Sequence, residues 1–251
     1  MEKIKNPLPN SILKKWPEGS VTQWFGENPD LYAFMGYPGH PGIDIYQPYG
    51  ALICAATDGK IANVHLQEAN KLGGLQIDLF SPIQEDGFVY ETIYAHCSEI
   101  LVTQGQEVKA GDPIGRVGNS GFVVSGGVKH WQNSNPDNKG THLHLGLRIW
   151  KPLRPGDMES LVIQNFDNKY HGWIDPMPYL QNSQPDAIIK DMVTKEQLRK
   201  LYLLAFDREP DNLATGYLGM DWDFVLSELL ESQELQKRVS LWQAIKTFFE
   251  K

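Results

Sequence analysis

Two histidines separated by one residue are the side chains in this sequence whose type and spacing most suggest chemistry. His142 and His144 lie in GTHLHLGL, an apolar run flanked by glycines. On a β-strand, residues two apart point to the same face, with Cα atoms roughly 7 Å apart. Because an imidazole binds a metal or transfers a proton near neutral pH, the pair is suited to a metal ligand with a catalytic neighbour.

A second segment, GHPGID, supplies a histidine and a carboxylate four residues apart. His40 and Asp44 flank a proline and a glycine, which disfavour a helix and favour a loop or an extended chain. Alone, this spacing is more typical of a surface pair or a cap. Together with His144 it gives two imidazoles and one carboxylate, the ligands of a hydrolytic Zn²⁺ site with one position left for water. The sequence therefore predicts zinc on these three residues, with His142 as a candidate general base beside it.

A third histidine ends the β-type run GFVYETIYAHC. Strict alternation along a strand would place Tyr94 and His96 on one face and Cys97 on the other. His96 is therefore a candidate second catalytic imidazole, which Tyr94 would help to orient. Because Cys97 would point away, a thiol nucleophile paired with His96 is disfavoured. A cysteine peptidase using Cys54 or Cys97 is the weakest of the alternatives.

The elements that must position these side chains are predicted to be strands. Between about residues 20 and 180, short β-type runs are broken by Gly, Pro, Asn and Asp, and helical periodicity is weak. Turns such as TDG and EDG supply the residues that antiparallel hairpins require. We therefore expect a mainly β, antiparallel domain. Its two cysteines would be buried free thiols or a single bridge.

After about residue 185 the pattern becomes helical. The polar segment QNSQPD is typical of a linker, Thr194 and Gln197 form a capping-box pattern, and apolar residues then recur at helical spacing. This predicts a small all-α domain at the C-terminus. The expected organisation is an N-terminal extension over 1–20, the β domain over 21–182, a linker over 183–193 and the helical domain over 194–251.

Charge and hydropathy exclude two classes of partner. The net charge is -8, and no basic cluster exceeds Lys14 and Lys15, which argues against nucleic acid. No run approaches the roughly 20 apolar residues that a bilayer-spanning helix needs. No secretory signal is visible in the basic N-terminal segment. If the protein works outside a cell, we expect that it is exported by another route, that its signal was removed, or that a phage delivers it.

These residues, in this order, resemble the lysostaphin-type, LytM-like zinc endopeptidases of peptidase family M23. The resemblance covers about residues 20–180. The motifs that carry it are GHPGID, GALICAATDGKIANV, YAH, GQEVKAGDPIGRVGNSG and THLH.

The resemblance implies a lysostaphin-type antiparallel fold, similar to a duplicated hybrid motif, with a substrate groove. It implies one zinc ion on His40, Asp44 and His144, and His96 and His142 as the catalytic pair. The implied reaction is hydrolysis of peptide bonds in peptidoglycan stems or cross-bridges. The implied location is extracellular, periplasmic or facing the cell wall.

The chain departs from the family pattern before THLH. Residues 123–139 look longer than the usual connection, and such a polar insertion is expected to be a surface loop. His130 and Trp131 within it would contact substrate or be incidental. Asn119 and Tyr94 are the other candidate groove residues.

Two functions of different classes remain open. In an endopeptidase, His142 would accept a proton from water and His96 would stabilise the tetrahedral intermediate, or the two roles would be exchanged. In a noncatalytic wall-binding or regulatory module, the fold would be kept without hydrolysis. The C-terminal helices resemble a small helical domain of unknown function marked by an R-E-P-D turn. They would bind the wall, contact a partner protein or simply complete the fold.

Overall fold

The computed structural model describes residues 4–9, 11–66 and 71–181. By its contacts the chain separates into two units, Met1–Pro185 and Asp186–Lys251, and only the first contains described residues. The predicted linker and all-α domain lie outside the described residues.

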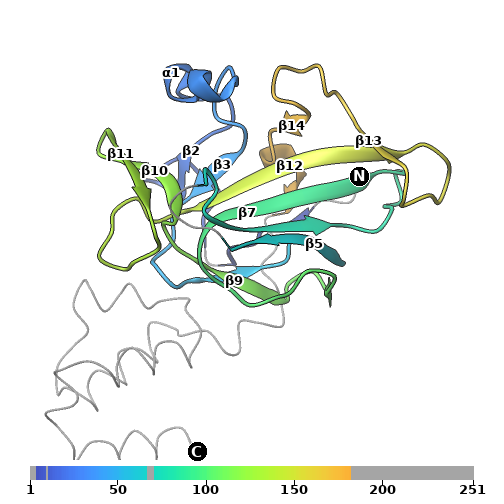
Figure 1. Cartoon of the computed structure of the whole chain (residues 1–251), viewed down its shortest axis with the longest axis horizontal. Coiled ribbons are helices and arrows are strands. Elements are labelled where there is room, and N and C mark those ends of the chain that lie inside the picture. The colour runs from blue at the N-terminus through green and yellow to red at the C-terminus, as the bar shows by residue number, and fades with distance from the viewer. Residues whose placement is uncertain (1–3, 10, 67–70, 182–251) are drawn as a thin grey trace, which may run out of the picture. The chain divides into compact units, whose positions relative to one another are not determined.

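The described part of the chain is built almost entirely of strands, as Figure 1 shows. Its strands are β1 (Ile4–Lys5), β2 (Val21–Gln23), β3 (Ile43–Ile45), β4 (Leu52–Cys54), β5 (Gly59–His65), β6 (Leu75–Phe80), β7 (Val89–Ile100), β8 (Glu107–Val108), β9 (Pro113–Val117), β10 (Gly121–Ser125), β11 (Val128–Gln132), β12 (Leu143–Pro152), β13 (Leu161–Ile163), β14 (Trp173–Ile174) and β15 (Leu180–Gln181). The helical turns are α1 (Pro29–Tyr32), η1 (Ala33–Met35) and η2 (Met177–Tyr179). The expected mainly β fold is confirmed, and no helix in these ranges is long and apolar enough to cross a bilayer.

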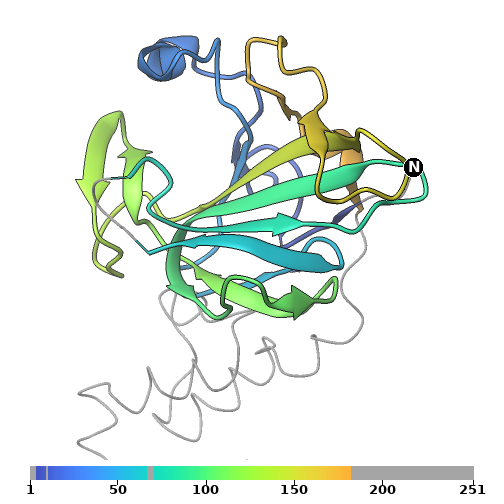
Figure 2. The ribbon, with the colours of Figure 1, turned by 45° about the vertical axis from the view of Figure 1, so that its right-hand side comes forward.

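One large sheet carries the fold. Its strands follow the order β2-β3-β12-β7-β6-β5-β8, with β13 and β14 paired to β12, and with β4 joined through β9 to β7. The long strands β7 and β12 run side by side through its centre (Figures 1 and 2). In this register His144 lies opposite Asp44 on one side and Ala95 on the other. The sheet thus brings three distant parts of the sequence together.

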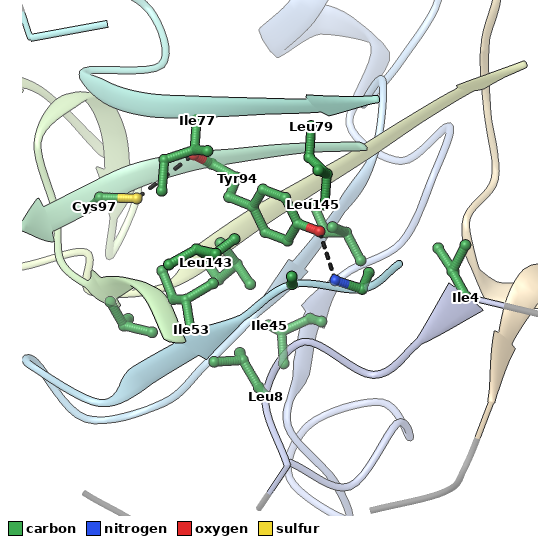
Figure 3. Close-up of a cluster of buried hydrophobic side chains, with 14 of the residues drawn as sticks. Ile4, Leu8, Ile45, Ile53, Ile77, Leu79, Tyr94, Cys97, Leu143 and Leu145 are labelled. Carbon is green, nitrogen blue, oxygen red and sulfur yellow. Dashed lines mark hydrogen bonds between the residues drawn. The ribbon is translucent and has the colours of Figure 1, made fainter. Parts of the chain in front are cut away.

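One face of the sheet packs on the hydrophobic core (Figure 3). Leu143, Leu145 and Leu147 are buried there, so the alternate residues of β12, including His144 and Arg148, lie on the opposite face. Burial of each such leucine contributes about 1.5–3 kcal/mol. The core fixes which face of β12 remains open for a site.

The N-terminal segment also contributes to this core. Ile4 and Leu8 are buried in it, and β1 pairs in parallel with β15 through Ile4 and Leu180. The sequence predicted an N-terminal extension over residues 1–20. The described residues of that segment, from Ile4 onward, therefore include part of the folded unit.

The insertion before THLH forms a β-hairpin, so the expectation of a plain surface loop was wrong for its first part. Strands β10 and β11 pair antiparallel around Gly126 and Gly127, whose φ angles are 56° and 78°. Two consecutive positive φ angles are the requirement of a type I′ hairpin turn, and Gly–Gly meets it without strain. The Gly–Gly pair between β-type residues is the sequence signal for this hairpin.

Candidate metal centre

Three side chains converge on one point at the open face of the sheet. The Nε2 atom of His40 lies 2.8 Å from Nδ1 of His144, and Oδ1 of Asp44 lies 3.1 Å from the first and 3.0 Å from the second. The three predicted ligands are the group in the described chain that could hold a metal ion. His40 is buried, and about a tenth of the side chains of Asp44 and His144 is exposed, so the cluster is open on one side.

Local sequence explains how the ligands approach one another. Asp44 and His144 are paired residues of β3 and β12, and His40 stands in the loop before β3. A Cβ atom on Gly42 would lie 2.5 Å from the carbonyl oxygen of Leu145 and 2.8 Å from Cε1 of His144. Glycine is therefore required here because the loop passes directly over the imidazole of His144.

The spacing of these atoms suits a tetrahedral ion. Zinc bonds of about 2.0–2.1 Å hold tetrahedral ligand atoms roughly 3.3 Å apart, so the three donors need to separate by only a few tenths of an ångström. Nδ1 of His40 lies 3.2 Å from the carbonyl oxygen of Trp24. A proton on that Nδ1 leaves the lone pair of Nε2 directed at the cluster, as a metal ligand requires. The residues present fit zinc.

Two further imidazoles lie beside the three ligands, as predicted. Nε2 of His142 is 3.6 Å from Oδ1 of Asp44, and the ring centroids of His142 and His96 are 4.7 Å apart. Nδ1 of His142 donates to the carbonyl oxygen of Gly140 at 2.7 Å, and Nδ1 of His96 donates to that of Ser120 at 2.8 Å. These bonds fix the tautomer, so both Nε2 atoms are proton acceptors in the neutral rings.

A β-bulge places His96 at the site. Leu75 lies opposite Cys97 and Ile77 lies opposite Tyr94, so two residues of β7 oppose one of β6. His96 has φ 63°, a left-handed conformation uncommon for a residue with a side chain. The extra residue reverses the alternation and turns His96 toward the other histidines.

The same bulge makes the prediction for Tyr94 wrong. Tyr94 is fully buried in the core, where its hydroxyl accepts a hydrogen bond from the amide of Ala56 at 2.9 Å and lies 2.9 Å from Oγ1 of Thr92 (Figure 3). It neither lines the groove nor contacts His96. Strict alternation fails because the bulge shifts the residues after Tyr94 by one position.

The electrostatics of the centre keep its carboxylate charged. Burial alone would raise the pKa of Asp44, but His40 and His142 and the hydrogen bond from His144 hold it well below the usual value. Burial lowers the pKa of His144. Burial, together with the neighbouring His142 and His144, lowers the pKa of His96 well below that of a free imidazole. The neutral form is therefore favoured for His96 and His144 and the ionised form for Asp44, and for Asp44 and His144 these are the protonation states of metal ligands.

An open groove of about 500 Å³ runs over the centre. Its lining includes Asp44, His96, His142 and His144, and extends along β12 to Arg148. Further lining residues that sequence reasoning missed are Thr22, Gln23, Tyr32, Gln76, Phe122 and Trp173. Nothing in their spacing marks them, since they come from separate strands and loops that meet only in the fold.

The remaining candidate groove residues have other surroundings. Asn119 is buried, and its side chain binds the carbonyl oxygens of Asn135 and Asn138, so it fixes the loop after β11. His130 and Trp131 lie on β11 outside the groove lining, although Trp131 packs on the lining residue Phe122 with ring centroids 4.9 Å apart. Substrate contact by His130 and Trp131 stays a prediction.

The two cysteines are free and buried. Burial raises the pKa of each thiol to about 12. A nucleophilic cysteine needs a lowered pKa and access to substrate. The cysteine-peptidase alternative is therefore wrong, and so is a bridge between Cys54 and Cys97.

Ligands from two paired strands and a loop, at the floor of a groove and beside two acceptor imidazoles, form an arrangement that could hold a metal ion close to two proton acceptors. Comparison with known families shows which family has a similar sequence. Residues 38–155 match the model of peptidase family M23. The match covers slightly less than half of the chain, and over that part the sequence is similar to peptidase family M23.

The individual relatives include lysostaphin and an activator of murein hydrolases. Lysostaphin of Staphylococcus simulans is 35% identical over 167 residues, which cover 64% of this chain and 26% of that protein. The murein hydrolase activator NlpD of Escherichia coli K12 is 33% identical over 108 residues, 43% of this chain and 24% of NlpD.

Among solved structures, the catalytic domain of lysostaphin from Staphylococcus simulans is 25% identical, covers 57% of this chain and 79% of that one, and has a TM-score of 0.36. The chain spans between a quarter and about half of the length of the first curated relatives that it matches.

Proposed function

We propose that this protein is a zinc-dependent endopeptidase that hydrolyses peptide bonds in the stems or cross-bridges of bacterial peptidoglycan. The observation that carries the proposal is the complete set of five side chains at one groove. His40, Asp44 and His144 present three donor atoms within 4.8 Å of one another, and His96 and His142 stand beside them. The match to a peptidase family and to lysostaphin supports the same activity.

Zinc held by the three ligands would supply two effects, a lowered pKa of bound water and polarisation of the substrate carbonyl. The chain supplies the proton chemistry. Because Nδ1 of His142 donates to Gly140, Nε2 carries the lone pair of the neutral ring, and it is the group that accepts a proton from the attacking water. It then returns the proton to the leaving amine.

His96 is proposed to position the same water. Its Nδ1 proton is committed to the carbonyl oxygen of Ser120, so its Nε2 accepts a hydrogen bond rather than donating one. Its buried environment keeps it neutral. In the resting state, His96 therefore orients water, and His96 becomes a donor to the tetrahedral intermediate only if it takes the water proton in place of His142.

The experiment that tests the proposal is digestion of purified peptidoglycan sacculi by the zinc-loaded protein. New amino groups and the masses of the released fragments are measured. We expect cleavage by the native protein and a loss of about 10²–10⁴-fold in rate for His142→Ala, the usual contribution of a general base. Zinc content is the control, since His142 is not one of the three ligands. Normal cleavage by the zinc-loaded variant would show that His142 is not the base.

A noncatalytic module is the second candidate, because the matched relatives include NlpD, a murein hydrolase activator. Incubation with purified sacculi distinguishes the two functions. A zinc-loaded protein that sediments with sacculi and releases no new amines would be a binding or activating module. We favour the enzyme because its metal ligands and both imidazoles are all present.

The proposed substrate fixes the proposed location. Peptidoglycan lies outside the cytoplasmic membrane, so the protein would act outside the cell, in the periplasm or at the wall, after export or delivery by a phage. The proposed contact of the C-terminal segment with wall or a partner protein concerns residues outside the described ranges.

A further inference from the structure

Among the described residues that line the groove, Arg148 is the single lysine or arginine. It lies on β12 four residues after His144 and on the same face of the strand, because the intervening leucines point into the core. At roughly 3.3 Å per residue, its Cα lies about 13 Å along the strand from that of His144. The groove therefore has a metal centre at one point and a cation further along.

The guanidinium of Arg148 is held in a fixed orientation. Its Cζ atom lies 3.6 Å from the ring centroid of Trp173, which is its paired residue on β14. Stacking on an indole restrains the plane of the guanidinium while its edges stay available for hydrogen bonds. A fifth of the side chain remains exposed. Such a restrained fork suits recognition of a carboxylate.

The protein does not use all the hydrogen-bonding capacity of Arg148. Its Nε is buried and has no hydrogen-bond partner among the described residues. Glu91, the paired residue on β7, forms an ion pair with Arg148 in which its Oε2 lies 3.7 Å from Nη1, beyond hydrogen-bond length. The same Oε2 accepts a 2.7 Å bond from Nε1 of Trp150. A buried donor without an acceptor calls for a partner that the protein alone does not provide.

The rest of the groove is compatible with an acidic ligand at this position. Asp44 at the metal centre is the one carboxylate in the described lining, and Glu91 is not part of it. A negatively charged group near Arg148 would thus meet no other carboxylate of the lining, and it would share the guanidinium with the buried Glu91, whose Oε2 also accepts the bond from Trp150.

We propose that Arg148 is a specificity-determining residue that binds a carboxylate of the wall peptide, about three to four residues from the scissile bond. Residues of an extended peptide rise about 3.3 Å each, which sets this spacing. The protein would then prefer stem-peptide cross-links with free carboxylates over neutral peptides such as glycine bridges. This inference rests on the proposed function for its substrate, and it deepens that function by naming the charge that the groove selects.

The test uses two cross-linked stem-peptide dimers that share the same scissile bond. In one the side carboxylates are free, and in the other they are amidated. For the native zinc-loaded protein we expect kcat/KM to favour the free-carboxylate dimer. In Arg148→Gln this preference falls by about 10–100-fold, mainly through KM, because one charge-assisted pair is lost. Arg148→Lys keeps part of it.

Matched variants separate specificity from structure. Glu91→Gln breaks the same ion pair but leaves the arginine, so the preference is kept. Lys151→Gln removes one positive charge from the same strand outside the groove lining, and it also keeps the preference. If Arg148→Gln lowers kcat/KM equally for both dimers, or if the native protein does not distinguish the two dimers, the proposal is overturned.

A binding measurement keeps this test independent of hydrolysis. Calorimetric titration of both dimers into the metal-free protein measures the same preference without turnover. If no dimer is cleaved but the free-carboxylate dimer binds more tightly in an Arg148-dependent manner, the endopeptidase proposal fails and the carboxylate site stands. If both dimers are cleaved and bound alike, the endopeptidase stands and the carboxylate site fails.

Discussion

At the residue scale, Asp44 contacts three of the four histidines of the centre. Its Oδ1 atom lies within 3.6 Å of a ring nitrogen of His40, His142 and His144. Burial of a carboxylate is costly without such partners, and here the partners hold its pKa low. The charge that the ligand set needs is therefore built into the fold.

Gly42 is the residue whose substitution tests this packing most directly. In Gly42→Ala the added methyl would contact the carbonyl of Leu145 and the ring of His144. We expect a loss of about 1–3 kcal/mol of stability from overpacking and a weaker affinity for zinc, because His144 must move. Unfolding by denaturant and titration with zinc measure the two effects.

Gly59→Ala is the matched control for that experiment. Its methyl would collide with the carbonyl of Phe80, away from the metal centre. We expect reduced stability with unchanged zinc affinity. If Gly42→Ala binds zinc as tightly as the native protein, the close approach of the loop to His144 is not important for the centre.

The five side chains of the centre could be predicted from sequence, because each lies in a short motif whose residue types and spacing can be recognised locally. The hydrogen-bond acceptors that orient their rings could not. They are backbone carbonyls of Trp24, Ser120 and Gly140, and a carbonyl carries no side-chain signal. Arg148 was missed because a single arginine on a strand indicates a groove residue only when its neighbours on β7 and β14 are known.

At the element scale, the bulge in β7 decides which side chains face the groove. It turns His96 outward and keeps Tyr94 and Cys97 in the core. Alternation along the strand predicted that His96 and Cys97 face opposite ways, which is confirmed, but placed Tyr94 with His96, which was wrong. A bulge depends on pairing with a neighbouring strand, so the sequence of β7 alone does not reveal it.

Tyr94→Phe distinguishes a core role from a role in orienting His96. The variant leaves the buried amide of Ala56 without its acceptor, so we expect a loss of about 1–3 kcal/mol in the free energy of unfolding. Denaturant unfolding gives this value. Zinc affinity and the rate of wall cleavage should stay near native values. A large loss of cleavage in a stably folded variant would restore the orienting role.

At the scale of the whole molecule, the sheet serves as one platform for both ends of the groove. Strand β12 carries His144 at one position and Arg148 four residues later, and its other face is anchored in the core (Figure 3). The antiparallel class was predictable from short β-type runs with turn residues between them. The strand order was not, because β3, β7 and β12 are neighbours in the sheet but lie far apart in the sequence.

The most direct measurement of the central claim is the position of zinc in crystals of the protein, located by anomalous diffraction at the zinc edge. We expect one strong peak per chain, within about 2.0–2.2 Å of Nε2 of His40, Oδ1 of Asp44 and Nδ1 of His144. The peak should vanish in Asp44→Ala, with the sheet unchanged. A native protein that shows no peak at this point in ample zinc, or one bound by other residues, would contradict the account.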